Sequence, residues 1–443
     1  MTTPILDFLN TYAASDTLRL HMPGHKGLPA LGCEALDITE IAGADALYEA
    51  GGIIAESERS AAALFGSART LYSTEGSSQC IRAMVFLALQ NRPSGAPGRI
   101  LAGRNAHKAF LYAAALCGAE VDWLWPRAGE RLTGCTVTPA ALESALASAR
   151  YAAVYVTSPD YLGQMLDIAQ LAAVCRAHRV PLLVDNAHGA YLKFLPEDEH
   201  PITLGADACC DSAHKTLPCL TGAAYLHLSA HAPAGWAERA EQAMSLFAST
   251  SPSYLILQSL DRMNGELAGE YPARLRGTVE KLSAFKKALL SEGWDLAGDE
   301  PMKLTLRAAE RGYTGTELQE LLRAKGIECE FSDREYLVLM PSPETSDEDF
   351  TRLLSALRKI PQREPLADQP PVLPVPEKAC SIREAMFSRR ETVPVDQAVG
   401  RILADACVSC PPAVPVIIAG ERITPQAAEC MKYYGITECE CVL

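Results

Sequence analysis

Short, almost continuously apolar runs alternate with helix-like segments between about residues 60 and 230, and this alternation limits the chain to few folds. The runs at 99–104, 151–158 and 180–187 lack the polar alternation of a half-exposed strand, so we expect strands that are covered on both faces. Alternating strands and helices predict a mostly parallel sheet with right-handed crossovers. We therefore predict an α/β large domain over residues 61–285.

Further parts are expected on both sides of this domain. Residues 1–60 form an N-terminal segment, and a helical stretch at 274–293 leads to a small α+β domain over 286–360. The segment 361–380 contains six prolines and is predicted to be a linker. A C-terminal module covers residues 381–443.

Composition excludes several classes of protein. The net charge of −14, from 40 basic and 54 acidic residues, argues against nucleic acid as a partner, because phosphate binding needs a basic surface. No apolar run approaches the roughly 18–20 residues that span a bilayer, and the N-terminus lacks the pattern of a signal peptide. We therefore expect a cytoplasmic protein without a membrane partner. The fifteen cysteines are scattered and many lie inside apolar segments, so we expect mostly reduced core thiols and no metal, with the role of the tail "CECVL" left open.

Two ionisable residues are expected at the carboxyl ends of neighbouring strands, where open α/β sheets bind ligands. Asp185 ends the run "PLLVD", and Lys215 follows the next run in "DSAHKTLPCL". A lysine and an aspartate are what pyridoxal 5'-phosphate (PLP) needs, because the amine forms a Schiff base and the carboxylate partners the pyridinium nitrogen. A strand cap and an unrelated surface charge would explain the same two residues.

Three further features favour the PLP interpretation without requiring it. Gly76, Ser77 and Ser78 precede a helical segment, and a helix N-terminus with hydroxyl groups is a site for anions, although ordinary capping fits equally well. His107 follows a strand-like run, where its ring can stack on an aromatic cofactor. His188 lies close to Asp185 in the sequence. No dinucleotide or P-loop glycine signature competes with this interpretation.

An ordered set of segments resembles the Orn/Lys/Arg decarboxylase family, and more narrowly its short bacterial members without the N-terminal wing domain. These segments are "HMPGHKG", "DITEIAGADAL", "LFGSARTLYSTEGSS", "RNAHKA", "TSPDYLG", "VDNAHGAY", "DSAHKTLPCLTGAAYLH" and "PPAVPVIIAGERI". The resemblance covers essentially the whole chain, and S-x-H-K is its most specific part. It implies the fold type I PLP architecture of aspartate aminotransferase: a large domain with a mostly parallel sheet, a small α+β domain and a C-terminal module.

The resemblance also implies a role for each site residue. Lys215 would form the Schiff base, Asp185 would pair with the pyridine nitrogen, His107 would stack on the ring, and His188 would lie near the substrate. The cofactor phosphate would be held by Gly76, Ser77, Ser78, Ser212 and His214. Glu330, in "GIECEF", would bind the distal cation of the substrate.

Four residues depart from the family pattern. Glu75 stands where the family usually shows Asn, Asn186 stands where short members often show Glu, and Gln79 and Cys80 are unusual in the phosphate loop. These departures leave the cofactor set intact but leave the substrate open.

The resemblance implies decarboxylation of a basic amino acid in polyamine biosynthesis, with arginine favoured over lysine or ornithine. An aminotransferase is the first alternative, but the late strand "YLVLMPSP" lacks the arginine with which those enzymes hold the α-carboxylate. A non-catalytic regulatory member is the second, although inactive relatives usually lose the lysine that is present here.

The same architecture implies a homodimer or higher homo-oligomer. The turn "HMPGHKG", with His21, His25 and Lys26, either reaches the neighbour's site or is a plain surface turn.

Overall fold

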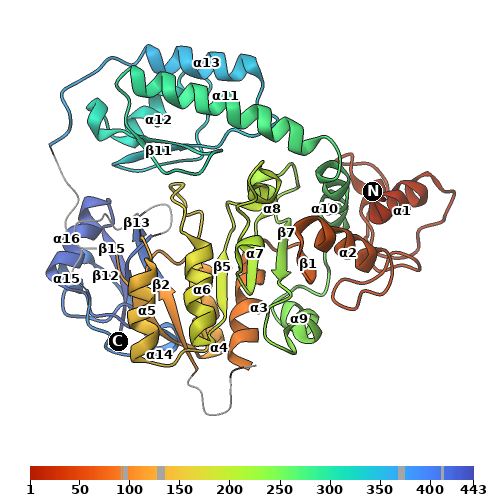
Figure 1. Cartoon of the computed structure of the whole chain (residues 1–443), viewed down its shortest axis with the longest axis horizontal. Helices are drawn as coiled ribbons and strands as arrows, with labels where there is room; N and C mark the ends of the chain where they lie inside the picture. The colour runs from red at the N-terminus through yellow and green to blue at the C-terminus, as the bar shows by residue number, and fades with distance from the viewer. Residues whose placement is uncertain (91, 93–97, 127–134, 368–374, 411–413) are drawn as a thin grey trace. The chain divides into compact units, whose positions relative to one another are not determined.

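The computed structural model describes residues 1–90, 92, 98–126, 135–367, 375–410 and 414–443 (Figure 1). The chain divides into two compact units. The first contains residues 1–97, 146–155 and 168–274, and the second contains residues 98–145, 156–167 and 275–443. Part of the predicted proline-rich linker, residues 368–374, lies outside the described residues.

The largest sheet has seven strands in the order β1-β7-β6-β5-β4-β2-β3. Its strands are β1 (Arg69–Ser73), β2 (Arg99–Gly103), β3 (Glu120–Leu124), β4 (Ala153–Thr157), β5 (Leu182–Asp185), β6 (Ala208–Asp211) and β7 (Ala224–Leu228). β5 pairs in parallel with β6 and β2 pairs in parallel with β3, whereas β7 runs antiparallel to both β1 and β6. The mostly parallel α/β sheet predicted from the apolar runs is therefore confirmed.

Burial explains why those runs lack polar alternation. Every residue of β5, β6 and β7 is buried, and β4 is buried except at its last residue. A strand that is covered on both faces carries mostly apolar side chains. Its polar residues then gather at the strand ends, as Asp185 and Asp211 do.

Helices complete the first unit. They are α1 (Pro4–Ala14), α2 (Ile53–Phe65), α3 (Ser77–Gln90), α6 (Ile168–His178), α7 (Pro201–Leu204), α8 (Ala213–Thr216), α9 (Trp236–Ser245) and α10 (Tyr254–Leu267). Buried Asp261 of α10 accepts hydrogen bonds from the backbone N–H groups of Ile5 and Leu6, each at 2.9 Å. These N–H groups have no partner within their own helix, so α10 caps α1.

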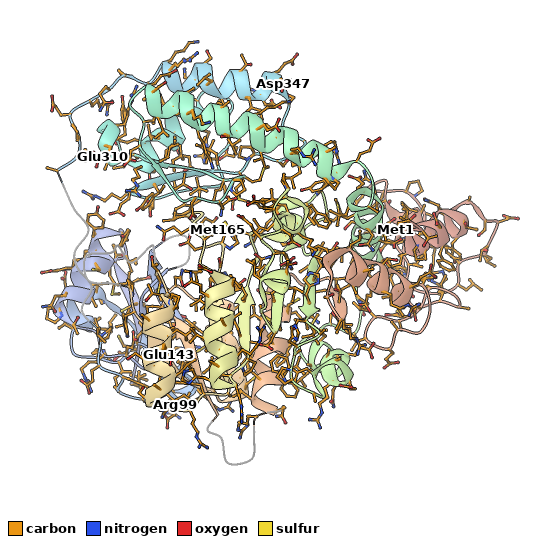
Figure 2. All side chains as sticks on the ribbon, in the orientation of Figure 1. Met1, Arg99, Glu143, Met165, Glu310 and Asp347 are labelled. Carbon is orange, nitrogen blue, oxygen red and sulfur yellow. The ribbon has the colours of Figure 1, made fainter. Side chains whose placement is uncertain are left out.

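A small four-stranded antiparallel sheet in the second unit has the order β10-β11-β9-β8. Its strands are β8 (Leu296–Ala297), β9 (Leu304–Arg307), β10 (Phe331–Ser332) and β11 (Tyr336–Leu339), and its helices are α11 (Tyr271–Ser291), α12 (Gly315–Arg323) and α13 (Asp347–Arg358). Leu289, Leu318, Leu337 and Leu357 belong to one core, so the three helices pack on this sheet (Figure 1). Asp347 begins α13 at the surface (Figure 2).

The end of the chain has a core of its own, which contains Val395, Leu403, Val416 and Met431. Its elements are α14 (Ile382–Phe387), β12 (Arg390–Pro394), α15 (Val395–Ala398), β13 (Cys407–Cys410), β14 (Val414–Ile418), α16 (Pro425–Tyr433) and β15 (Glu438–Val442). β12 pairs with β15, and β13 pairs with β14. The second unit also contains α4 (Lys108–Cys117), and α5 (Pro139–Ser148) begins in it.

The cysteines that the structure describes are free thiols. Cys439 and Cys441 of the tail are buried in β15 with their sulfur atoms 3.9 Å apart. Within the described part of the chain, none of the helices combines the length and the apolar character needed to cross a bilayer.

Candidate active site

Lys215 lies in α8, the single helical turn between β6 and β7. Its Nζ atom is 3.1 Å from Nε2 of His188, which is 5% exposed. Its backbone N–H donates to the carbonyl of Ser212 at 3.0 Å. The fold therefore brings the predicted lysine to a polar partner that comes from the segment after β5.

Asp185 ends β5 and is 2% exposed. Its Oδ2 atom accepts a hydrogen bond from the hydroxyl of Tyr155 at 2.9 Å, and its Oδ1 atom accepts one from the backbone N–H of Ala187 at 3.2 Å. A carboxylate is costly to bury without such donors. The two hydrogen bonds hold the carboxylate in one orientation, as a partner for a cation requires.

The predicted phosphate loop is the start of α3. This helix begins at Ser77, and Ser212 donates a hydrogen bond from its hydroxyl to that of Ser77 at 2.8 Å. Gly76 has a φ of +71° and donates its N–H to the carbonyl of Gly222 at 2.8 Å. Hydroxyl groups from two loops thus meet at the N-terminus of a fourteen-residue helix, a place that favours anions. Ser78 lies in the first turn of the same helix.

His214 neighbours Lys215 in α8, and its Nδ1 atom lies 2.9 Å from the carbonyl oxygen of Ala223. Burial lowers the pKa of His214, and the positive charge of Lys215 lowers it further. Because a carbonyl oxygen can only accept a hydrogen bond, Nδ1 carries the hydrogen of this contact.

A buried polar network behind this site was missed in the sequence. Asp211, the last residue of β6, accepts hydrogen bonds from Nδ2 of Asn186 at 2.7 Å and from Nε2 of His200 at 3.0 Å. Burial by itself raises the pKa of Asp211, but His200 and His227 outweigh that effect and the pKa is lowered. The acidic end of the run "ACCD" was the available signal. Tyr155 was also missed, because a tyrosine within an apolar strand resembles an ordinary core residue.

Two of the departures from the family pattern have structural roles. Asn186 follows Asp185 and ties the end of β5 to Asp211 at the end of β6. Gln79 is fully buried, and its amide donates to the hydroxyl of Tyr48 at 2.6 Å and to the carbonyl of Met244 at 2.9 Å. Both residues hold the loops that carry the candidate site.

His107 and Glu330 belong to the second unit. His107 caps α4, with Nδ1 accepting a hydrogen bond from the N–H of Ala109 at 3.2 Å. Glu330 directly precedes β10, is exposed, and accepts a hydrogen bond from the hydroxyl of Tyr161 at 2.7 Å. Desolvation and the neighbouring Glu330 raise the pKa of Tyr161, so its hydroxyl stays protonated and donates.

The ring of Tyr161 packs edge-on against that of Phe331, with 5.6 Å between the ring centres, and one cation lies close to it. Lys303 is buried, with Nζ 5.5 Å from the centre of the Tyr161 ring. Its ammonium group donates to the carbonyl oxygens of Asp160 and Tyr161 at 3.2 and 3.0 Å. The loop that carries Tyr161 is therefore anchored through its backbone, and Tyr161 was not recognised as a site residue from sequence.

Two family models match the chain, and both describe domains of the same family. The family model described as "Orn/Lys/Arg decarboxylase, major domain" matches residues 3–303, and the model of the C-terminal domain of the same family matches residues 367–439. Arginine decarboxylases from Bacillus anthracis and Bacillus subtilis are each 29% identical to the chain, over 96% of its length and 92% of theirs.

Solved structures support the same fold. The lysine decarboxylase of Francisella novicida superposes with a TM-score of 0.81 at 17% identity, covering 100% of this chain and 81% of that protein. The constitutive lysine decarboxylase of E. coli superposes with a TM-score of 0.79 at 18% identity, covering 100% of this chain and 82% of that protein. The sheet, the placement of Lys215 and Asp185 at its strand ends and the family matches lead to one conclusion: the chain belongs to the Orn/Lys/Arg decarboxylase family.

Proposed function

We propose that this protein binds PLP through Lys215 and decarboxylates a basic amino acid, with arginine the first candidate and lysine and ornithine the others. The observation that carries the proposal is the pairing of Lys215 with His188 at 3.1 Å, in the same unit as the buried carboxylate of Asp185. The arginine decarboxylases among its relatives support the choice of arginine. The amine product would serve polyamine synthesis.

The residues present fit the cofactor by their chemistry. The hydroxyls of Ser77 and Ser212 and the N-terminus of α3 would hold its phosphate, together with Gly76, Ser78 and His214. Asp185 would pair with its ring nitrogen, and His107 would stack on the ring. When bound, the cofactor accepts the electron pair that stays on the substrate's α-carbon as CO₂ leaves.

Each polar residue then has a definite task. Asp185 is held in place by hydrogen bonds from Tyr155 and Ala187. Its negative charge would therefore stay beside the ring nitrogen of the cofactor, whose positive charge it would stabilise. His188 is within hydrogen-bond distance of Nζ of Lys215 and can take a proton from the amine or return one to it. Because a lysine amine attacks a carbonyl only when it is neutral, a neighbouring imidazole that accepts its proton assists attachment.

Glu330 is the proposed contact for the distal cation of the substrate. Its carboxylate is exposed in the single chain, and Tyr161 orients it with a 2.7 Å hydrogen bond. A guanidinium or ammonium group can donate hydrogen bonds to this carboxylate while the Tyr161 hydrogen bond stays intact, because a carboxylate has two oxygens with several acceptor positions.

We also propose a homodimer. Leu18, Leu20, Met22, Leu28 and Leu31 are between 69% and 89% exposed, all within one stretch of the N-terminal segment. Apolar side chains gathered in this way mark a surface that another protein covers. Light scattering at the assay concentration should give twice the mass of the chain, and an active monomer would contradict the proposal.

The test of the function is a substrate panel. The purified protein, loaded with PLP, is incubated separately with arginine, lysine and ornithine, and both CO₂ and the amine are quantified. We expect equal amounts of CO₂ and amine from one of the three. Formation of a keto acid without CO₂ would indicate an aminotransferase, and no turnover with bound PLP would indicate a regulatory protein.

A further inference from the structure

Arg104 is a completely buried arginine close in sequence to His107. It follows the last residue of β2 and precedes His107 by three positions. Its guanidinium carbon lies 5.2 Å from the centre of the Trp123 ring and 4.7 Å from that of Trp125, so two indole rings contact the cation. Its backbone N–H donates to the carbonyl of Leu124 at 3.0 Å.

The counter-charge of Arg104 comes from the C-terminal module. Oε2 of Glu421 is 2.9 Å from a terminal nitrogen of Arg104, and Glu421 is 4% exposed. The same oxygen accepts a hydrogen bond from the backbone N–H of Ile418 at 2.9 Å, so the backbone of the C-terminal module also holds this carboxylate. Gly420, with a φ of +88°, makes this turn possible, since a Cβ atom there would lie 2.5 Å from the carbonyl oxygen of Cys380.

Stability alone does not account for such a pair. Taking two charges out of water costs about as much as their attraction returns, and apolar residues of similar size often serve a fold as well. What a buried pair does provide is a defined geometry, because neither charge tolerates separation from the other. Here that geometry is imposed on the turn from Gly103 to His107, which closes with a 3.1 Å hydrogen bond from the N–H of Ala106 to the carbonyl of Gly103.

We propose that Glu421 is a positioning residue for the reaction, by which the C-terminal module holds, through Arg104, the turn that carries His107. The inference rests on the proposed function, in which His107 stacks on the cofactor. It assigns the C-terminal module a part in cofactor binding, although none of its residues belongs to the candidate site.

A pocket next to the pair makes a sharp test possible. It has a volume of about 200 Å³ and is lined by Glu421, Trp123 and Trp125 together with Glu120, Asp122 and Lys378, among others. Asp122 is already paired with Arg99 at the start of β2, at 3.4 Å, and Glu120 is paired with Lys378. In Glu421→Ala, the lost carboxylate leaves space that joins this pocket, so acetate can enter and replace the missing charge beside Arg104.

The experiment measures PLP affinity, kcat/KM and the thermal stability of the apoprotein for Glu421→Ala, with and without acetate. Sodium chloride at equal ionic strength controls for salt. The matched control variant is Glu377→Ala, which removes an exposed carboxylate of the same module that pairs with Arg422 at 3.0 Å. We expect Glu421→Ala to lose at least about tenfold in PLP affinity, since breaking one partner of a buried charge pair has large effects, and Glu377→Ala to lose less than about twofold. Acetate should restore the affinity at least about threefold by mass action, and chloride should not.

A second variant guards against a failure to fold. Arg104→Met combined with Glu421→Met replaces the pair by apolar side chains, which preserves stability in comparable cases. We expect this double variant to melt close to the parent protein and still bind PLP weakly. Affinity equal to that of the parent, in either variant, would overturn the inference. His107→Ala separates the two proposals. If His107→Ala binds PLP normally, the proposed function is wrong about His107. If His107→Ala binds PLP weakly and Glu421→Ala binds it normally, only the role of Glu421 is refuted.

Discussion

Replacing Asp185 by asparagine tests the candidate site most directly, because the change removes a charge and preserves the shape. In the parent protein, the carboxylate accepts from Ala187 at 3.2 Å on one oxygen and from Tyr155 at 2.9 Å on the other. In Asp185→Asn, the amide oxygen can keep the first hydrogen bond. The amide NH₂ can donate to the Tyr155 hydroxyl, whose hydrogen is free to rotate.

The structure therefore predicts little loss of stability from Asp185→Asn, less than about 1 kcal/mol, because both buried groups remain hydrogen-bonded. The loss of function should be much larger. An amide cannot stabilise a protonated ring nitrogen as a carboxylate does, and we expect kcat to fall at least about a hundredfold, or about 2.7 kcal/mol of barrier.

Tyr155→Phe is the companion variant, because it keeps the charge and removes one hydrogen bond to it. A hydrogen bond to a charged group contributes about 1.5–3 kcal/mol, so the loss in cofactor affinity should lie between about ten- and 150-fold. Turnover of bound cofactor should fall less than in Asp185→Asn.

The assay is CO₂ release at saturating PLP, with cofactor content and thermal unfolding measured on the same preparations. A kcat within tenfold of the parent value in Asp185→Asn would refute the assignment of Asp185. So would a large stability loss that accounts for the whole effect.

Three further predictions address other residues. Lys215→Ala should abolish turnover and the covalent retention of PLP after borohydride reduction while leaving unfolding nearly unchanged; more than a few per cent of residual activity would end its assignment. Glu330→Gln should lower kcat/KM for the best substrate by more than about thirtyfold if a desolvated cation binds there, against less than about tenfold for an exposed contact; Glu328→Gln, an exposed carboxylate paired with Arg323 at 2.8 Å, is the control. Burial raises the pKa of Asp160 to about 6 in the folded protein. The folded state therefore binds the proton of Asp160 more tightly than the unfolded state does, which stabilises the fold by about 3 kcal/mol at a pH below the pKa of Asp160 in the unfolded chain. This stabilisation is lost as the pH rises through 6. In Asp160→Asn, the free energy of unfolding measured with urea should therefore lack this decrease with rising pH. Identical pH profiles of the unfolding free energy in the variant and the parent protein would contradict the assigned pKa.

Asp333 is the next acidic candidate if Glu330 fails, but the structure gives it a different task. It is 5% exposed, and one carboxylate oxygen accepts the backbone N–H groups of Glu335 and Tyr336, at 2.7 and 2.6 Å. Such a carboxylate stabilises the turn between β10 and β11. A loss of activity in Asp333→Asn would therefore need a stability measurement beside it.

Much of the fold could be predicted from local sequence. Continuous apolar runs indicate strands that are buried on both faces wherever they occur, and β4 to β7 follow that rule. The start of α3 was predictable at the loop of Gly76 to Ser78, because the hydroxyl-rich loop precedes a helical pattern. The family motifs marked Lys215 and Asp185, which stand where the chain leaves β6 and β5.

The contacts that hold those residues were not predictable in the same way. Tyr155 contacts Asp185 because β4 neighbours β5, and Asn186 contacts Asp211 because β6 lies on the other side of β5. Neither pair has a signature in the local sequence, since each partner fits its own segment by itself.

The sequence by itself determined several strands of the large sheet, the helical segments between them and the residue types of the candidate site, because those depend on neighbours along the chain. Only the tertiary structure decided which side chains share a buried charge. Arg104 and Glu421 are 317 positions apart and meet at 2.9 Å, and nothing within either segment requires the other. The physical reason is that burying a charge without a partner costs much free energy. A buried charge is therefore paired with an opposite charge that lies close to it in the folded chain, whatever the distance along the sequence.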